Sequence, residues 1–395
     1  MPNPSQRSAA VAPSPIRKFL PLVRKVESSG IEVIKLNVGD PDIAPDQSIV
    51  RGIRSYGARM IPYAPSPGTI EHTKAWQTFY KRQGIMIGTD SIIPTVGCAE
   101  AMLIALLATT DPGDEVLVFE PLYTSYKGFA ALLNIKLRPI TLSIKNGFAL
   151  PNELEITRRI TKKTRAILVI NPSNPTGAVL SQKEITMLAR IARTHSLFVI
   201  ADETYREIVF GSRPKSFLSQ SSVREHILVL DSASKRFSVP GARIGCIVSR
   251  NKEIMDAVLR IAMVRLSAPT VEQYALAPIL RNPNAYIKKI VQEYHARRDT
   301  VLAKLSCMPG VVTYAPQGAL YLIVELPVAD AEQFILFMLT KFRYQKTTVL
   351  VAPASGFYVT PKKGINQIRI AYVVNRAKLK QAMDILARGM QAYIS

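Results

Sequence analysis

The sequence predicts an α/β protein with two parts: a large domain with a mostly parallel sheet flanked by helices, and a smaller α+β domain built from both chain ends. Between about residues 90 and 250, short apolar runs alternate with amphipathic helical stretches, the pattern of a parallel sheet covered on both faces. After about residue 285, a long helix, separate strands and a terminal helix replace that alternation. The length of 395 residues also favours two domains over one.

Five β-rich runs of strand length supply the strands of the large domain. Among the helical stretches between them, "SQKEITMLARIARTH" opens with a capping box formed by Ser181 and Glu184, and its apolar residues keep helical spacing. Sheets of this kind bind ligands at the carboxyl ends of their strands, so functional residues are expected there. The five runs are "EVLVFEP", "RAILVINP", "LFVIAD", "ILVLDS" and "ARIGCIVS".

The smaller domain is expected from the stretches that follow residue 285. The segment before residue 45 is too short to fold alone, so it should join this domain. We therefore expect an N-terminal segment of the small domain at residues 1–45, a large domain at 46–285 and the small C-terminal domain at 286–395. The stretches are the helices "AYIKKIVQEYHARRDTVLAKL" and "AKLKQAMDILARGMQAYI" and the strands "ALYLIVEL", "TTVLVAP" and "QIRIAYVV".

Composition argues against several classes of protein. No apolar run is long enough for a membrane helix, and the first residues, "MPNPSQRSAAVAPSPIRKF", lack the apolar core of a signal peptide. Their Pro, Ser and Ala content predicts a loosely ordered lead-in. The cysteines Cys98, Cys246 and Cys307 are far apart and form no disulfide or metal-binding pattern, so we expect a reducing, cytoplasmic location and no metal site.

The formal net charge of +22 is unusually high. It has two interpretations, a nucleic-acid-binding surface or a basic solvated surface. The basic pairs are dispersed along the chain, and no RNP-like aromatic pattern or zinc finger accompanies them. We therefore expect no nucleic-acid partner, and a positive field that attracts anionic substrates and phosphorylated cofactors.

Polar residues cluster just beyond the ends of the expected strands. Taken singly, each has an ordinary structural explanation: Asp202 could cap a helix, Asn174 could stabilise a turn, and a lysine after a strand commonly lies on the surface. Their combination in this order favours one ligand site with a phosphate grip, a buried carboxylate and a lysine. The residues are Gly97 before a helix start, Asn171 and Asn174 in "VINPSNPTG", Asp202 and Tyr205 in "VIADETY", Ser232 and Lys235 in "VLDSASK", and Arg243.

These motifs resemble those of a known family. "NPSNPTG", "ADETY", "SASKRFSVPGARIG" and "IRIAY" occur together and in the family's order. From about Arg17 to Ala392 the chain is similar to the class I/II aminotransferases of the pyridoxal-phosphate fold-type I superfamily, and among these to bacterial aspartate aminotransferases. The resemblance implies pyridoxal 5′-phosphate as the cofactor.

The resemblance also implies how that cofactor is held. Lys235, whose small neighbours leave room for a ring, should form the internal aldimine, and its amine must be neutral to act. Asp202 should pair with the pyridine nitrogen and keep it protonated, which makes the ring an electron sink. Tyr205 and Asn174 should donate hydrogen bonds to the ring oxygen. Tyr123 should stack on the ring, at a position where many relatives carry tryptophan. The phosphate, beside Gly97, should be bound by Ser232, Arg243 and the N–H groups of Cys98 and Ala99.

Further residues are implied to contact the substrate or a second subunit. Arg369 in "IRIAY" should bind the substrate α-carboxylate through a bidentate contact that lysine cannot make. Gly39 in "LNVGDPD" should lie against the substrate. Tyr63 in "YAPSPG" should reach the phosphate held by the neighbouring subunit, which implies a homodimer with shared sites.

The basis of side-chain preference is less clear from the sequence. One aspartate-specific branch of the family carries a lysine for the distal carboxylate where this chain has Ala99. Another branch lends an arginine from the partner subunit, and Arg265 in "MVRLSAPT" stands close to that region. Arg265 is therefore either a residue that reaches the neighbouring site and favours aspartate or glutamate, or a surface or interface residue.

The expected activity is transfer of an amino group from an L-amino acid, aspartate or another acidic donor, to a 2-oxo acid such as 2-oxoglutarate by a ping-pong mechanism. One alternative is a β-lyase reaction with the same cofactor and fold, which the motifs do not exclude. A second alternative is a regulatory DNA-binding protein built on this fold. Such regulators carry a helix-turn-helix domain ahead of the fold, whereas some forty residues rich in Pro and Ser precede it here.

Overall fold

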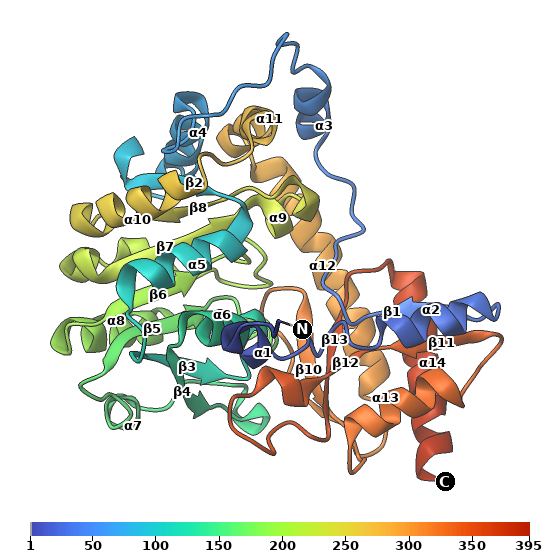
Figure 1. Cartoon of the computed structure of the whole chain (residues 1–395). Coiled ribbons are helices and arrows are strands. Elements are labelled where there is room, and N and C mark those ends of the chain that lie inside the picture. The colour runs from blue at the N-terminus through green and yellow to red at the C-terminus, as the bar shows by residue number, and fades with distance from the viewer. Residues whose placement is uncertain (1) are drawn as a thin grey trace.

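The computed structural model describes residues 2–395. The largest sheet of this part of the chain has seven strands (Figure 1). The strands in spatial order are β2 (Ile92–Thr95), β8 (Gly245–Val248), β7 (Ile227–Ser232), β6 (Phe198–Asp202), β5 (Thr164–Ile170), β3 (Glu115–Glu120) and β4 (Lys136–Thr141). The strands from β7 to β4 are parallel, whereas β8 is antiparallel to both of its neighbours. The predicted fold class, α/β with a mostly parallel sheet, is confirmed.

Alternate residues of the central strands contact opposite layers of helices. In β7, Leu228 and Leu230 join the apolar cluster of α5 (Gly97–Thr109), α6 (Ser125–Leu133) and α10 (Lys252–Val264). Ile227 and Val229 join the cluster of α4 (Ile70–Lys81), α8 (Gln182–Thr194) and α11 (Thr270–Arg281) on the other face. A strand buried on both faces requires a continuous apolar run, which is why these segments are recognisable in the sequence.

The helix predicted from its capping box is α8. The Ser181 hydroxyl accepts from the Glu184 N–H at 3.2 Å, and a Glu184 carboxylate oxygen accepts from the Ser181 N–H at 2.7 Å. Both predicted bonds are therefore present. Shorter helices on the large sheet's side of the molecule are α3 (Gln47–Arg54), α7 (Glu153–Thr157) and α9 (Ala233–Arg236).

Two smaller sheets form beside the large one within the described residues. One is antiparallel, in the order β12 (Ala352–Pro353), β13 (Gln367–Ala371), β10 (Tyr321–Glu325) and β9 (Val312–Thr313); the other pairs β1 (Glu32–Lys35) in parallel with β11 (Thr347–Leu350). The N-terminal strand thus lies against the C-terminal part of the chain. The helices of this part are α2 (Leu20–Ser28), α13 (Ala331–Thr340) and α14 (Arg376–Ile394), and α12 (Asn284–Leu305) runs toward it from the large sheet (Figure 1). Domain limits at residues 45 and 285 remain a prediction.

The N-terminal lead-in is more ordered than its composition predicts. It contains the short helix α1 (Gln6–Ala10), which lies beside α6, and a turn that buries Ile16 and Phe19. Ile16 packs in an apolar cluster with Phe357. The expectation of loose order was wrong because a few apolar residues in a Pro-rich segment suffice to fix it on the smaller sheets. Met1 lies outside the described residues.

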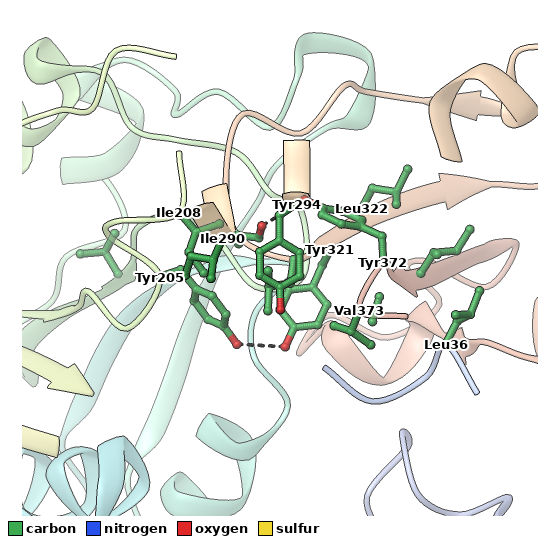
Figure 2. Close-up of a cluster of buried hydrophobic side chains, with 14 of the residues drawn as sticks. Leu36, Tyr205, Ile208, Ile290, Tyr294, Tyr321, Leu322, Tyr372 and Val373 are labelled. Carbon is green, nitrogen blue, oxygen red and sulfur yellow. Dashed lines mark hydrogen bonds between the residues drawn. The ribbon is translucent and has the colours of Figure 1, made fainter. Parts of the chain in front are cut away.

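The large and small sheets meet through an aromatic cluster (Figure 2). Tyr205, which follows β6, and Tyr321, the first residue of β10, point toward each other, and their hydroxyls are 3.0 Å apart. Tyr294 of α12 and Tyr372 belong to the same buried cluster. The site described below therefore receives residues from both parts of the chain. None of the helices formed by residues 2–395 has both the length and the apolar character that a membrane crossing needs.

Candidate active site

A cavity of about 640 Å³ lies at the carboxyl ends of β5, β6 and β7. Asp202 ends β6, Ser232 ends β7, and Asn174 follows β5, so the strand ends bring together residues far apart in sequence. This is where parallel sheets place ligands. Lining residues predicted from the sequence are Gly39, Cys98, Ala99, Tyr123, Asn174, Asp202, Tyr205, Ser232, Lys235 and Arg243; other lining residues include Arg17, Asp40 and Tyr126.

Lys235 lies on the short helix α9, which Ser232 caps by accepting a hydrogen bond from the Ser234 N–H. Its amine donates a hydrogen bond of 2.6 Å to the Gly39 carbonyl. Burial lowers the pKa of Lys235 to about 8; the carboxylate of Asp40 opposes this shift, and the charges of Arg369 and Arg243 support it. At pH 7 roughly a tenth of the amine is then neutral, far more than for an ordinary lysine, and the neutral form is the one a nucleophile or base requires.

Asp202 is a buried carboxylate in the cavity wall. It accepts hydrogen bonds from the Tyr126 hydroxyl at 2.9 Å and from the Thr204 N–H at 3.0 Å. Burial still raises the pKa of Asp202, because these bonds do not fully replace its hydration. A protonated ring nitrogen in the cavity would supply the missing positive partner.

A phosphate could be held where α5 begins. Gly97 has a φ of 70°, and Val96, the residue before it, offers the first turn no side-chain cap, so the N–H groups of Cys98 and Ala99 are free for an anion. The Arg243 guanidinium is held beside this turn by a hydrogen bond of 3.2 Å to the Val96 carbonyl. The positive φ favours glycine at residue 97, and a Cβ there would lie 2.5 Å from a guanidinium nitrogen of Arg243, which would have to move away.

Tyr205 and Asn174 lie side by side at the wall. The Asn174 amide nitrogen donates to the Tyr205 hydroxyl at 3.5 Å, and burial raises the pKa of Tyr205 well above its ordinary value. Tyr205 therefore stays protonated and can donate to a ligand oxygen. Tyr123 is half-buried and meets the Tyr126 ring edge-on at 5.6 Å between centroids.

Arg369 of β13 is 1% exposed and lies behind the wall rather than lining the cavity. One guanidinium nitrogen donates to the Asn174 side-chain oxygen at 3.1 Å, another donates to the Asn37 carbonyl, and the ring of Tyr321 lies 4.4 Å from the guanidinium carbon. Within residues 2–395 its Nε has no hydrogen-bond partner. Burial lowers the pKa of Arg369, so a carboxylate reaching this cation would compensate both the charge and the unpaired donor.

Two residues predicted from the sequence lie away from the cavity of this chain. Arg265 donates to a Glu100 carboxylate oxygen at 3.1 Å and to the Pro94 carbonyl at 2.5 Å. Tyr63 is 78% exposed on the loop between α3 and α4. This chain alone therefore gives neither residue a contact with the cavity.

Sequence reasoning did not single out Tyr126, Tyr321 or Asn37. Tyr126 lies in the first turn of α6, three residues after Tyr123, which precedes that helix; this closeness in sequence is the signal that could have found it. Tyr321 contacts both Tyr205 and Arg369, and its hydroxyl fills the space where Gly39 would carry a Cβ. Only the pairing of β10 with β13 places it there.

Comparison with known proteins places this site in a family. The family model described as "Aminotransferase class I and II" matches residues 31–386. The aspartate aminotransferase of Pyrococcus abyssi is 30% identical over 98% of each chain, and the aromatic-amino-acid aminotransferase 2 of Thermococcus litoralis is 29% identical over 98% of each. A solved alanine aminotransferase from Pyrococcus furiosus is 29% identical, with a TM-score of 0.90 over 99% of this chain and all of that one. With a family match across most of its length and the fold to accompany it, the chain belongs to the class I and II aminotransferases, a family of pyridoxal-phosphate-dependent enzymes.

Proposed function

We propose that this enzyme transfers an amino group from an acidic L-amino acid, such as aspartate, to a 2-oxo acid such as 2-oxoglutarate by a ping-pong mechanism. The observation that carries this proposal is the arrangement around Lys235. Its amine, with a pKa lowered to about 8, faces a cavity that also holds the buried carboxylate Asp202 and has the arginine Arg369 behind its wall. Removal of a proton from the carbon beside a carboxylate needs a base, a partner for the cofactor ring and a cation for the carboxylate. Lys235, Asp202 and Arg369 would supply these in that order.

The charges and hydrogen-bonding groups of the cavity lining suit pyridoxal phosphate. The hydrogen bonds to Asp202 do not fully offset the cost of burying its negative charge, and the ring nitrogen would pair with this carboxylate. Tyr205 and Asn174 would donate to the ring oxygen, and Tyr123 would stack on the ring. The Gly97 turn, with the N–H groups of Cys98 and Ala99, would hold the phosphate together with Ser232 and Arg243.

The cofactor, when bound, supplies an electron sink for the negative charge that develops at the substrate Cα. With the cofactor bound, Lys235 would accept the proton from the substrate Cα and later donate it again, because its amine lies in the cavity and burial lowers its pKa to about 8. Arg369 orients the substrate through its α-carboxylate, with Asn174 beside it. The Gly39 backbone lies along the substrate, and its carbonyl holds the Lys235 amine while that amine is free.

A homodimer with shared sites is part of the proposal. Tyr63 would reach the phosphate of the partner subunit from a loop that is fixed at its base, where the Thr270 hydroxyl accepts from the Ala64 N–H and donates to the Pro62 carbonyl. Large apolar side chains are exposed on and around this loop, as expected of a surface that another subunit covers. They are Met60, Ile61, Ile70, Val264, Leu266 and Tyr274. A cytoplasmic location also remains a prediction.

A half-reaction tests the proposed chemistry. We expect purified enzyme with bound cofactor and one amino acid, without an acceptor, to release one equivalent of 2-oxo acid per site and then stop. Addition of 2-oxoglutarate should restore the starting absorbance spectrum. Continuous release of pyruvate from a cysteine conjugate without any acceptor would instead establish a β-lyase and overturn the proposal.

A further inference from the structure

The three cationic side chains that line the cavity differ in their hydrogen-bond partners. Lys235 donates to the Gly39 carbonyl, and Arg243 donates to the carbonyls of Pro240 and Val96. Arg17 is the third cationic residue of the lining. Within residues 2–395 its side chain makes no hydrogen bond and no ion pair, and it is exposed. An unpaired guanidinium at a cavity wall is available to an anion that enters from solution.

The backbone that carries Arg17 is held in place on both sides. Ile16 and Phe19 are buried, and the Ile16 carbonyl accepts a 2.7 Å hydrogen bond from the Asn37 side chain. The carbonyl of the same Asn37 accepts from Arg369. One residue therefore ties the Arg17 segment to the arginine expected to bind the α-carboxylate.

The neighbouring cation Lys18 is engaged elsewhere. Its amine pairs with the Glu332 carboxylate of α13 at 2.5 Å, and it does not line the cavity. The segment thus presents one arginine to the cavity and one lysine to the small sheets. This difference makes Lys18 a matched control for Arg17.

We propose that Arg17 binds the distal carboxylate of a dicarboxylic substrate and is the residue of this chain that selects aspartate, glutamate and 2-oxoglutarate. The inference rests on the proposed aminotransferase function and extends it to the substrate side chain. A guanidinium offers a carboxylate two parallel donors. Ala99 lines the same cavity with a short, uncharged side chain, so it leaves room for a substrate side chain and offers a carboxylate no partner.

Asp40 lines the same cavity and, unlike the buried carboxylate of Asp202, is exposed. Its carboxylate acts on Lys235, and it forms no ion pair with Arg17 among the described residues. It would repel an acidic side chain unless a cation such as Arg17 outweighs it. Asp40 would instead favour a basic donor if Arg17 played no part.

Three variants separate these possibilities. Arg17→Gln removes the charge, Arg17→Lys keeps the charge without the planar fork, and Lys18→Gln makes the same change in net charge one residue away. We expect Arg17→Gln to lower the kcat/KM ratio of aspartate to alanine about tenfold. A tenfold loss is larger than the few-fold effect of an exposed ion pair and smaller than the effect of a fully buried charged hydrogen bond, because Arg17 would be only partly covered by the substrate. Arg17→Lys should fall between Arg17→Gln and the wild type, and Lys18→Gln should leave the ratio unchanged.

Binding of unreactive acids gives a second measurement that does not depend on turnover. In calorimetric titrations of the enzyme with bound cofactor, Arg17→Gln should weaken succinate about tenfold relative to propionate. An unchanged succinate-to-propionate ratio, an equal effect of Lys18→Gln, or a wild-type enzyme that prefers basic donors would overturn the assignment of Arg17. If succinate binding depends on Arg17 while no amino acid is transaminated, the proposed function fails and the binding role of Arg17 stands.

Discussion

The two ends of the cavity differ in how their charged groups are held. At the cofactor end, Asp202 and Lys235 are largely buried and have hydrogen-bond partners. At the mouth, defined by Arg17 and Asp40, the side chains are exposed and unpaired within the described residues. The difference indicates that the cofactor end fixes the reaction, whereas the mouth is free to adapt to the substrate.

The relatives fit this division. Aminotransferases named for aspartate, aromatic amino acids and alanine are 29–30% identical to this chain, and the alanine enzyme shares its fold closely. Identity at this level therefore marks the shared reaction but does not distinguish the substrates. The side chains at the mouth are where we expect such differences to arise.

The largest effect is expected at the centre of the cofactor end. Lys235→Ala should reduce turnover by about 10⁴-fold or more, because the base and the nucleophile are lost together. The cofactor should still bind without a covalent bond, through the groups around its ring and phosphate. Steady-state kinetics and the absorbance spectrum of the dialysed variant check both points; residual turnover within tenfold of wild type would assign the base to another residue.

Asp202→Asn should reduce kcat by about 10³-fold, because the charge that keeps the ring nitrogen protonated is removed from a water-poor site. Tyr126→Phe is the matched control, since it removes one hydrogen bond to the same carboxylate and leaves its charge. We expect a loss of about tenfold for the control. Equal effects of the two changes would mean that Asp202 acts through its packing.

Arg265→Ala distinguishes the two interpretations of that residue. Its partner Glu100 also accepts a hydrogen bond from the Val96 N–H at the start of α5, so Arg265 supports the turn expected to hold the phosphate. A structural role predicts weaker cofactor binding and an equal loss of kcat/KM, about tenfold, for every donor. A loss confined to aspartate and glutamate would instead place Arg265 at the site of the neighbouring subunit.

The smallest effect concerns pH. With the pKa of Lys235 at about 8, the neutral fraction of the amine rises with pH, reaches one half near pH 8 and approaches completion more than about one unit above it. The rate at which the cofactor-free protein captures pyridoxal phosphate should rise likewise, with a midpoint near pH 8. Asp40→Asn should move the midpoint downward, because Asp40 stabilises the charged amine. A midpoint like that of free lysine, or one that Asp40→Asn does not move, would contradict this assignment.

The contrast between the two ends also explains what the sequence could predict. Asp202 and Ser232 stand at the ends of short apolar runs that alternate with helices, the pattern of buried parallel strands, so their meeting point follows from the fold class. The bond between Tyr205 and Tyr321 joins residues 116 positions apart, and Arg265 meets Glu100 across 165 positions. Such pairs depend on how the two parts of the chain pack, and a single sequence has no local pattern for them.

The N-terminal lead-in shows the same limit more directly. Composition indicates loose order there, yet Ile16 and Phe19 are buried and carry Arg17 to the cavity. The decisive feature is a surface formed by the distant residues Phe357 and Asn37. That surface exists only after the smaller sheets have assembled.

The central claim is that this cavity holds pyridoxal phosphate on Lys235. Borohydride reduction of the enzyme with bound cofactor, followed by proteolysis and mass spectrometry, tests it most directly because the reduced bond survives digestion. The account predicts one modified peptide per chain, with the pyridoxyl group on Lys235 in "SASKRF". A label on another lysine, or none in protein that retains the cofactor spectrum, would contradict it.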